Sequence, residues 1–159
     1  MSGSATPATR ALEALGIPFT AHPYRHDPAA ESFGREAAEA LGVEEARVFK
    51  TLLAQVDGAL VVGIVPVSGL LDLKALAAAI GGKRATMADP RLAERKTGYV
   101  VGGISPIGQR SRLDTVLDET AELWDTVFVS GGRRGLDIEL TPADLIRSTG
   151  ARLAAIAAE

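Results

Sequence analysis

Two apolar runs separated by an Asp-Gly pair dominate the middle of the chain. Residues 48–56 read VFKTLLAQV and residues 59–67 read ALVVGIVPV, and both are rich in β-branched and aromatic side chains. Runs of this length and composition are typical of buried strands. Asp57-Gly58 supplies the tight turn that two such strands need. The pattern therefore predicts a β-hairpin over residues 48–67.

Helix start and stop signals surround this hairpin. Pro7 near the start of PATRALEALG and Gly16 after it predict a first helix, because proline suits the first turn and glycine the end. Capping residues predict four more helices. They are expected over Gly34–Leu41 after Ser32, over 73–81 after Asp72, over 90–97 after Asp89 and from Thr141 onward.

Further strands are expected at Phe19–Tyr24, Thr126–Val129 and Leu136–Leu140. YVVGGISPIGQ, residues 99–109, is expected to be a strand that runs into an ordered glycine-rich loop. Strands, hairpins and helices in this irregular order predict an α+β fold with a mixed or largely antiparallel sheet. No linker or repeat divides the chain, so residues 1–159 are expected to form a single domain.

Lys50 is the anomaly in this pattern, because it lies inside the apolar run VFKTLLAQV. Burying an ammonium costs several kcal/mol unless the charge is paired or neutralised. The long stem of a lysine often reaches water from an apolar surface. Lys50 therefore either extends to the edge of the sheet or serves a functional site, and the residue pattern alone favours the first interpretation.

Composition limits the chemistry further. The chain contains no cysteine, which excludes disulfides, zinc-thiolate sites and a cysteine nucleophile. The first ten residues lack the apolar stretch of a signal peptide, and no segment approaches the ~20 apolar residues of a membrane span. We expect a cytoplasmic protein without a membrane or DNA partner.

Charge is distributed unevenly on this chain of net charge −3. Residues 83–112 carry seven basic and two acidic side chains, a local charge of +5. Such a stretch on an acidic protein is compatible with a polyanion on one face, although on charge alone a solvated surface is the better explanation. The basic residues are Lys83, Arg84, Arg91, Arg95, Lys96, Arg110 and Arg112.

Common catalytic motifs are absent. The sequence has no G-x-S-x-G, H-E-x-x-H or G-x-x-x-x-G-K-[ST] pattern. Glycine-rich loops at GGISPIGQ and SGGRRG could present backbone N–H groups to an anion, but each also reads as an ordinary turn.

His22, His26 and Asp27 could ligate a metal, yet no further cluster supplies a partner, so no metal site is expected. Asp137 and Glu139 share one face of their strand, which reads as an exposed polar face.

Five segments stand in order along the chain: HDP (26–28), VFKTLL (48–53), KRATMADP (83–90), KTGYVVGGISPIGQ (96–109) and VSGGRRGLDIEL (129–140). Together they closely resemble the YbaK/EbsC family of free-standing aminoacyl-tRNA deacylases, which are related to the editing domain of bacterial prolyl-tRNA synthetase. The resemblance extends from about Leu12 to Ala155. It implies a single α+β domain with a twisted mixed sheet, partly closed like a barrel, and no metal or organic cofactor.

The resemblance also implies an activity, the removal of cysteine mischarged on the proline tRNA, in trans alongside prolyl-tRNA synthetase. Its catalytic positions fall on Lys50, Ser130, Gly132 and Asp137. Its substrate-binding positions fall on Tyr24, Phe33, Thr51, Gly102 and Gly103, and the RNA-facing residues would be Lys83, Arg84, Arg95, Lys96, Arg110 and Arg112. The departures from the family pattern are Phe49 for tyrosine, GGRRG for GGKRG and Lys96 for serine; they leave the catalytic positions intact and put RNA contacts in doubt.

The implied mechanism uses the thiol of the substrate. Lys50 would pair with a tRNA phosphate, and the cysteinyl thiol would attack its own ester to release a thiolactone. Backbone N–H groups of Gly102, Gly103 and Gly132, aided by Ser130, would stabilise the oxyanion, and Asp137 would orient either Lys50 or the amino group of the cysteinyl moiety. Two alternatives stay open: a water-driven deacylase for alanyl- or another small aminoacyl-tRNA, and a non-catalytic adaptor that binds tRNA or the synthetase.

Overall fold

The computed structural model describes residues 5–158, so residues 1–4 and 159 of the expected domain lie outside the described part. The strands are β1 (Thr20–Pro23), β2 (Phe49–Val56), β3 (Ala59–Pro66), β4 (Leu70–Leu71), β5 (Ala85–Met87), β6 (Asp114–Asp118), β7 (Val127–Arg133), β8 (Leu136–Leu140), β9 (Arg152–Ala154) and β10 (Ala157–Ala158). The α-helices are α1 (Pro7–Leu15), α2 (Phe33–Leu41), α3 (Leu73–Ala79), α4 (Pro90–Thr97) and α5 (Pro142–Thr149), with 3₁₀ turns at Glu45–Arg47 and Glu119–Leu123.

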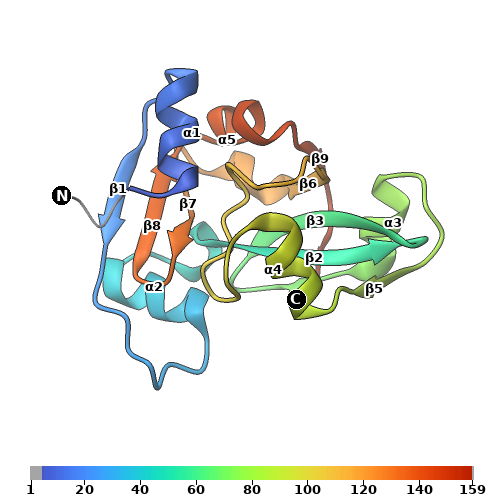
Figure 1. Cartoon of the computed structure of the whole chain (residues 1–159), viewed down its shortest axis with the longest axis horizontal. Helices are drawn as coiled ribbons and strands as arrows, with labels where there is room; N and C mark the ends of the chain where they lie inside the picture. Colours follow the sequence, from blue (N-terminus) through green and yellow to red (C-terminus); the bar gives the residue numbers. More distant parts are fainter. Residues whose placement is uncertain (1–4, 159) are drawn as a thin grey trace.

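These strands form three sheets (Figure 1). Five strands pair in the order β5-β2-β3-β6-β9, three in the order β1-β8-β7, and β10 pairs with β4. Antiparallel pairs predominate, while β6 runs parallel to both β3 and β9. The α+β class with a mixed sheet is thereby confirmed.

The predicted hairpin forms as expected. β2 and β3 pair without interruption from Phe49 opposite Pro66 to Val56 opposite Ala59. Asp57 and Gly58 both have positive φ, 50° and 87°, which is the type I′ geometry that an Asp-Gly turn favours.

Burial on both faces explains why β3 is apolar throughout. Val62 and Ile64 pack into a core cluster that includes Leu12 of α1. Val61 and Val65 point to the other face and pack with Leu76 of α3. A strand covered on both sides reads as a continuous apolar run, which is what residues 59–66 show.

The helix caps follow the sequence signals. Thr6 and Thr9 form a capping box at the start of α1, and Gly16 ends that helix in the left-handed conformation with φ of 69°. Ser32, Asp72, Asp89 and Thr141 each accept a backbone N–H at the start of their helices. The expected helix starts are therefore confirmed.

Residues 99–109 form the expected ordered loop, but the strand expected at their start is wrong. Gly98, Gly102 and Gly108 have φ of 83°, 89° and 70°, which breaks any extended run. The buried Tyr99 closes the loop on itself, since its hydroxyl donates to the carbonyl of Ile107 at 2.6 Å. The strand that lies next to β3 is β6, which the sequence analysis did not anticipate.

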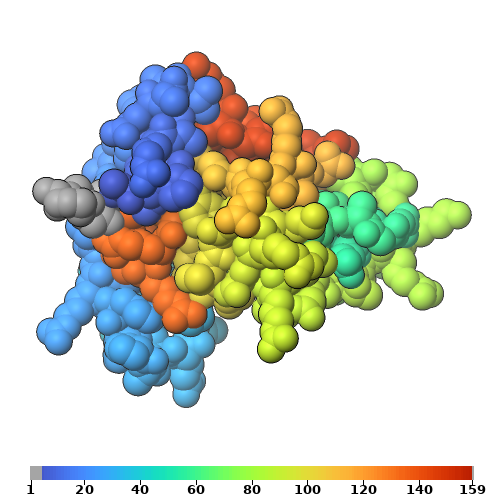
Figure 2. Space-filling model, in the orientation of Figure 1, coloured from blue at the N-terminus to red at the C-terminus, as the bar shows by residue number. Residues whose placement is uncertain are grey.

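The two larger sheets meet at one point. A single parallel bridge joins Val48 to Phe128, and α2 packs over this junction through Ala37 and Ala38. We find no additional pairing among residues 5–158 that would close the sheets into a barrel. Figure 2 shows the segment containing α4 in the middle of one face, between the β1–α2 segment on the left and the β2–β3 turn on the right.

Candidate active site

Apart from the bridge between Val48 and Phe128, no ladder among residues 5–158 covers the edge of the first half of β2 that faces away from β3. β3 pairs with the whole of β2, but β5 reaches only Ala54 to Val56. The N–H of Val67 donates to the carbonyl of Val48, so by alternation Lys50 and Leu52 bond to β3. The backbone N–H and C=O of Thr51 therefore face the open edge.

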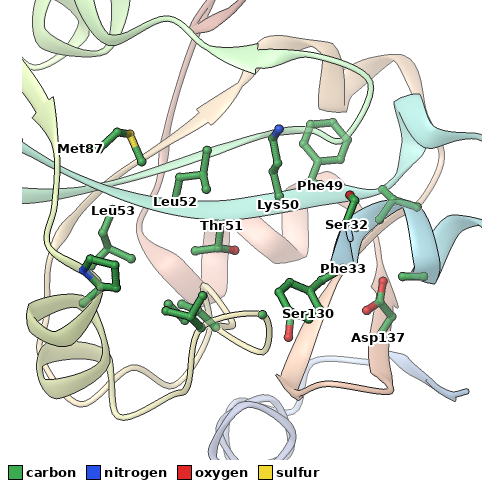
Figure 3. Close-up of a pocket in the computed structure, with 18 of the residues that line it drawn as sticks. Ser32, Phe33, Phe49, Lys50, Thr51, Leu52, Leu53, Met87, Ser130 and Asp137 are labelled. Atoms are coloured by element: carbon green, nitrogen blue, oxygen red, sulfur yellow. The ribbon is translucent and has the colours of Figure 1, made fainter. Parts of the chain in front are cut away.

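A cavity of about 400 Å³ lies along this edge. Its lining is mainly apolar and comes from the end of β1, the start of α2, β2, α4, the loop after α4 and the β7–β8 pair. Figure 3 shows how the side chains from these elements surround it. The lining includes seven of the nine predicted catalytic and substrate-binding residues: Tyr24, Phe33, Lys50, Thr51, Gly102, Ser130 and Asp137.

Lys50 lines the cavity and is half-buried. Burial lowers the pKa of its ammonium, and the nearby positive charge of Arg35 lowers it further. No ion pair of Lys50 occurs within the described part of the chain. An unpaired cation beside a second cation favours an anionic ligand.

Asp137 is almost fully buried, with 4% of its surface exposed. Burial raises the pKa of its carboxyl to about 7. Its Oδ2 atom has no hydrogen-bond partner in the structure. The sequence interpretation of an exposed polar face at this position is therefore wrong, because the cavity and α2 cover this side of β8.

Thr51 supplies a second buried oxygen without a partner. Its Oγ1 atom is inaccessible to solvent and makes no hydrogen bond in the structure. In Figure 3, Thr51 and Lys50 leave β2 in opposite directions, as adjacent strand residues must. Thr51 extends toward the same side of β2 as Ser130.

Ser130 lies directly opposite Asp137 across the β7–β8 pair. Its Oγ accepts the N–H of Gly132 at 3.2 Å, inside a β-bulge between Ser130 and Arg133. Gly132 has φ of 107°, and a Cβ there would lie 2.9 Å from the ring of Tyr99. Gly132 therefore shapes the bulge that carries Ser130.

Two of the three expected oxyanion donors are engaged elsewhere. The N–H of Gly132 donates to Ser130, and the N–H of Gly103 donates to the carbonyl of Val100 at 2.9 Å. Neither Gly132 nor Gly103 lines the cavity. The expectation that the N–H groups of Gly103 and Gly132 stabilise the oxyanion is therefore corrected. Of the three expected glycines, only Gly102 lines the cavity.

Phe33 and Gly102 line the cavity, and Arg134 packs against both of them. The guanidinium of Arg134 lies 4.6 Å from the ring centroid of Phe33 and donates to the carbonyl of Val101 through Nη2 at 2.6 Å. A Cβ on Gly102 would lie 2.9 Å from the Phe33 ring and 2.7 Å from Nε of Arg134. The sequence analysis missed Arg134, although GGRRG in place of GGKRG marks its neighbourhood.

Tyr24 lies at the end of β1, and its N–H donates to the carbonyl of Gly135 at 2.9 Å. Burial raises the pKa of its phenol to about 12, and the charge of Asp137 contributes in the same direction. Tyr24 and Asp137 therefore belong to the same end of the cavity.

The six expected RNA-facing residues are all exposed, but they do not form one patch. The backbone N–H groups of Lys83 and Arg84 donate to the carboxylate of Asp57 at the β2–β3 turn. Arg95, Lys96 and Arg110 gather at the end of α4, where Arg110 donates to the carbonyl of Arg95 at 3.3 Å. Arg112 lines a separate hollow beside Gly150. Their role in RNA binding stays a prediction.

The two histidines pair with acids outside the cavity. Nε2 of His22 lies 2.8 Å from Oε1 of Glu139, and Nδ1 of His26 lies 2.8 Å from Oε1 of Glu36. Within residues 5–158 no group of three or more His, Asp or Glu side chains is arranged to hold a metal ion. Over the same residues, no helix has the length and apolarity needed to cross a membrane.

Comparison with known proteins shows that the chain is similar to proteins that edit aminoacyl-tRNA. The aminoacyl-tRNA editing domain matches residues 26–148. A candidate Cys-tRNA(Pro)/Cys-tRNA(Cys) deacylase of Enterococcus faecalis, EbsC, is 37% identical over 155 residues, which cover 95% of this chain and 92% of that protein. The proline–tRNA ligase of Maridesulfovibrio salexigens is 31% identical over 100 residues, which cover 63% of this chain and 17% of the ligase.

The solved structure of a candidate trans-editing enzyme for prolyl-tRNA synthetase is also similar. It matches with a TM-score of 0.86 at 28% identity and covers 100% of this chain and 99% of that one. The resemblance to the YbaK/EbsC deacylases is confirmed. With most of its length matched, the chain belongs to the aminoacyl-tRNA editing domain family and has the activity class of an aminoacyl-tRNA deacylase.

Proposed function

We propose that this deacylase clears cysteine from mischarged tRNA(Pro), and that the cysteinyl thiol itself cleaves the ester. The observation that carries the proposal is the lining of the cavity, which holds one lysine, the carboxyl groups of Glu31 and Asp137, and hydroxyl groups, but no histidine or cysteine among the described residues. A serine nucleophile needs an adjacent base. Both histidines are paired elsewhere, with Glu139 and Glu36.

Lys50 is the positioning group in this proposal. The terminal ribose of a charged tRNA carries the ester beside a phosphate, and the unpaired ammonium of Lys50 suits that phosphate. Docking an anion there offsets the cost of the half-buried charge. Lys50 thus fixes the acceptor end along the open edge of β2.

The thiol then needs little help from the protein. Its sulfur attacks the ester carbonyl carbon, the bond from that carbon to the ribose oxygen breaks, and the thiol proton passes to the released ribose hydroxyl. The products are a cysteine thiolactone and free tRNA. Intramolecular attack gains its rate from orientation, and Gly102 is the remaining backbone donor at the cavity wall for the oxyanion.

The relation to prolyl-tRNA synthetase completes the proposal. Related sequences include a proline–tRNA ligase, and a similar structure is described as a trans-editing enzyme for that synthetase. We infer that selection of the proline tRNA comes from the synthetase, because the exposed basic residues here are scattered over several surfaces.

A second candidate is hydrolysis by water, which would extend the substrates to alanyl-tRNA. It is favoured by the burial of Asp137 at the cavity, which raises the pKa of its carboxyl to about 7 and suits a general base near neutral pH. The two routes differ in their need for a thiol. An adaptor without turnover is the third possibility, and it predicts tRNA binding with no deacylation.

The test is single-turnover deacylation of cysteinyl-, alanyl- and seryl-tRNA(Pro) by the wild type, Lys50→Ala, Asp137→Ala and Lys74→Ala. Lys74 is an exposed lysine on α3 and serves as the matched control. We expect fast loss of cysteine only, abolished by Lys50→Ala, weakened less by Asp137→Ala and unchanged by Lys74→Ala. Equal turnover by Lys50→Ala would remove the proposed role of Lys50, and equal rates on all three substrates would favour the water route.

A further inference from the structure

The hydroxyl of Thr6 joins the start of α1 to the bulge in β7. Thr6 is the N-cap of α1, and only 5% of its surface is exposed. Its Oγ1 accepts the N–H of Thr9 at 3.2 Å, as the hydroxyl of an N-cap residue usually does. The same hydroxyl donates its proton to the carbonyl of Gly131 at 2.5 Å, across 125 positions of the sequence. One side chain therefore caps the helix and contacts β7, against which α1 packs (Figure 1).

The bulge is the part of β7 that pairing with β8 does not hold. The ladder is interrupted between Ser130 and Arg133, which leaves two glycines outside it. A Cβ on Gly132, the second of them, would lie 2.9 Å from the ring of Tyr99 and 3.1 Å from Cβ of Thr6. Contacts with α1 and with Tyr99 therefore fix the shape of the bulge.

One peptide group links the hydroxyls of Thr6 and Ser130. The carbonyl of Gly131 and the N–H of Gly132 belong to the same planar unit. That unit accepts the proton of Thr6 at one end and donates to Oγ of Ser130 at the other, at 3.2 Å. Hydrogen bonds in such a chain polarise one another. Loss of the Thr6 donor would free the peptide to rotate and would move the hydroxyl that it holds.

Ser130 is the end of this chain that faces a substrate, because it lines the cavity. Its Oγ accepts the N–H of Gly132, and a hydroxyl can accept and donate at the same time. The proton of Ser130 is thus available for an oxygen of an ester bound in the cavity. The direction of that proton depends on the peptide that Thr6 fixes.

The first turn of α1 also contacts the loop after α4. A Cβ on Gly108 would lie 2.6 Å from the carbonyl oxygen of Pro7 and 3.1 Å from the nitrogen of Ala8. Ile107 packs with Ala8 in the same core cluster. This loop carries Gly102 of the cavity lining, whereas no residue of α1 lines the cavity. The start of α1 therefore supports two segments of the site without reaching the substrate.

We propose that Thr6 is a positioning residue for deacylation, which acts through the Gly131–Gly132 peptide on the hydroxyl of Ser130. The inference rests on the proposed function only in that the ester is cleaved in this cavity, and it holds whether a thiol or water attacks. Thr6 precedes both the matched editing domain, residues 26–148, and the segments that carry the family resemblance. Its role follows from contacts in the fold.

The test compares single-turnover deacylation of cysteinyl-tRNA(Pro) by the wild type, Thr6→Val, Thr6→Ser and Thr141→Val. Valine keeps the shape of threonine without the hydroxyl, and serine keeps the hydroxyl. Thr141 is the matched control, because like Thr6 it caps a helix whose first residue is proline, and it lies outside the cavity. Thermal unfolding shows that each variant folds. Both valine variants should unfold at a lower temperature than the wild type, since each loses a helix cap.

We expect Thr6→Val to lower the maximal rate by about 10- to 100-fold, because a displacement of about 1 Å at a reacting centre has an effect of this size. The enzyme concentration at half-maximal rate should stay close to that of the wild type, since Lys50 lies on β2, away from the bulge. Thr6→Ser should restore the rate and Thr141→Val should keep it. Equal losses of rate in the two valine variants would overturn the proposal, as would a failure of Thr6→Ser to restore the rate.

Gly108→Ala tests the same contact from the loop and remains informative if Thr6→Val does not fold. The added Cβ must displace the start of α1, because the carbonyl of Pro7 lies 2.6 Å from it. Gly81→Ala is the control, with a similar φ of 76° and nothing near its Cβ. We expect a lower maximal rate in Gly108→Ala alone, and equal rates in the two alanine variants would contradict the proposal.

Amide resonances separate this inference from the proposed function. In ¹⁵N-labelled protein without substrate, the amide signal of Gly132 should shift in Thr6→Val and Gly108→Ala and stay near its wild-type position in Thr6→Ser and Thr141→Val. If the wild type cleaves no cysteinyl-tRNA(Pro), the proposed function fails, yet this pattern of shifts would still support the hold of Thr6 on the peptide. An unchanged Gly132 signal in Thr6→Val would overturn the inference whatever the catalytic result.

Discussion

Arg134 stacks on Phe33 of the cavity lining, with the guanidinium carbon 4.6 Å from the ring centroid. The contact joins the first residue of α2 to the turn between β7 and β8, which are far apart in sequence. Arg134 also holds the loop after α4 through the carbonyl of Val101. One exposed arginine thus connects three segments that line the site.

Replacing Arg134 by alanine should impair substrate binding more than stability. An exposed cation–π contact is worth about 0.5–1 kcal/mol, so urea unfolding should change by no more than about that amount. The substrate concentration at half-maximal single-turnover rate should rise several-fold while the maximal rate stays close to wild type. Arg147→Ala on α5 is the control, and an equal effect of that variant would show that any lost positive charge suffices.

Gly102→Ala should inactivate the enzyme without unfolding it. The added Cβ would meet the Phe33 ring at 2.9 Å and Arg134 at 2.7 Å, so the wall of the cavity must shift. A displacement of about 1 Å at a reacting centre can lower the rate roughly 100-fold. Gly81→Ala is the matched control, because it has a similar φ of 76° with nothing near its Cβ. Both should lose about 1–2 kcal/mol of stability from left-handed strain, and retention of full activity by Gly102→Ala would contradict the assignment of this wall.

The stability of the protein should depend on pH through Asp137. Its pKa is raised in the folded state to about 7, above the unfolded value of about 3.9. The folded state therefore binds more protons between these values, and the free energy of unfolding falls as the pH rises from about 4 to 7 and is level above that. Asp137→Asn should remove this decline, so its stability advantage over the wild type should grow across that range.

Glu139→Gln should behave in the opposite sense. A hydrogen bond from Thr126, followed by His22, lowers the pKa of this carboxyl, so its contribution is present above the unfolded pKa and is lost as the pH falls. Urea titrations at several pH values compare the two variants with wild type. A parallel pH profile for wild type and Asp137→Asn would contradict the buried, unpaired carboxyl.

Asp118 should matter for stability and not for catalysis. Its buried carboxylate accepts the N–H groups of Ile156 and Ala157 at 2.9 Å each and the hydroxyl of Thr120 at 2.5 Å, which ties the C-terminal segment to β6. Asp118→Asn replaces one acceptor oxygen by a donor and should cost roughly 2–3 kcal/mol in urea unfolding. Asp125→Asn, at an exposed position, is the control. Unchanged stability of Asp118→Asn would show that the C-terminal segment is held by other contacts.

Local signals explain the parts of the fold that the sequence predicts well. The β2–β3 hairpin and the helix starts depend on adjacent residues such as Asp57-Gly58 and Thr6-Pro7. No strand forms at residues 99–109, because the conformation of this loop depends on the buried side chain of Tyr99 and on three glycines with positive φ. Short edge strands such as β5 and β9 are formed by pairing with distant partners, which no local pattern reveals.

In the site, too, some residues can be recognised from their neighbours in the sequence, and others only from contacts with distant segments. Lys50 stands out because it interrupts an apolar run, and the cavity along β2 accounts for it. Asp137 reads as exposed from alternation alone, because the sequence does not reveal that another sheet and α2 cover that face. Arg35 lies in no distinguishing motif, and Arg134 lies in the GGRRG segment without any sign of its contact; their roles follow only from their positions beside Lys50 and Phe33.

Thiol dependence tests the central claim most directly. Single-turnover deacylation by the wild type is compared on cysteinyl-tRNA(Pro) and on the same tRNA with S-methylcysteine, which retains the amino group and the ester but has no nucleophilic thiol. The account predicts rapid release of cysteine and no release of S-methylcysteine above the rate in buffer. Comparable rates on the two substrates would contradict it and would assign the reaction to water.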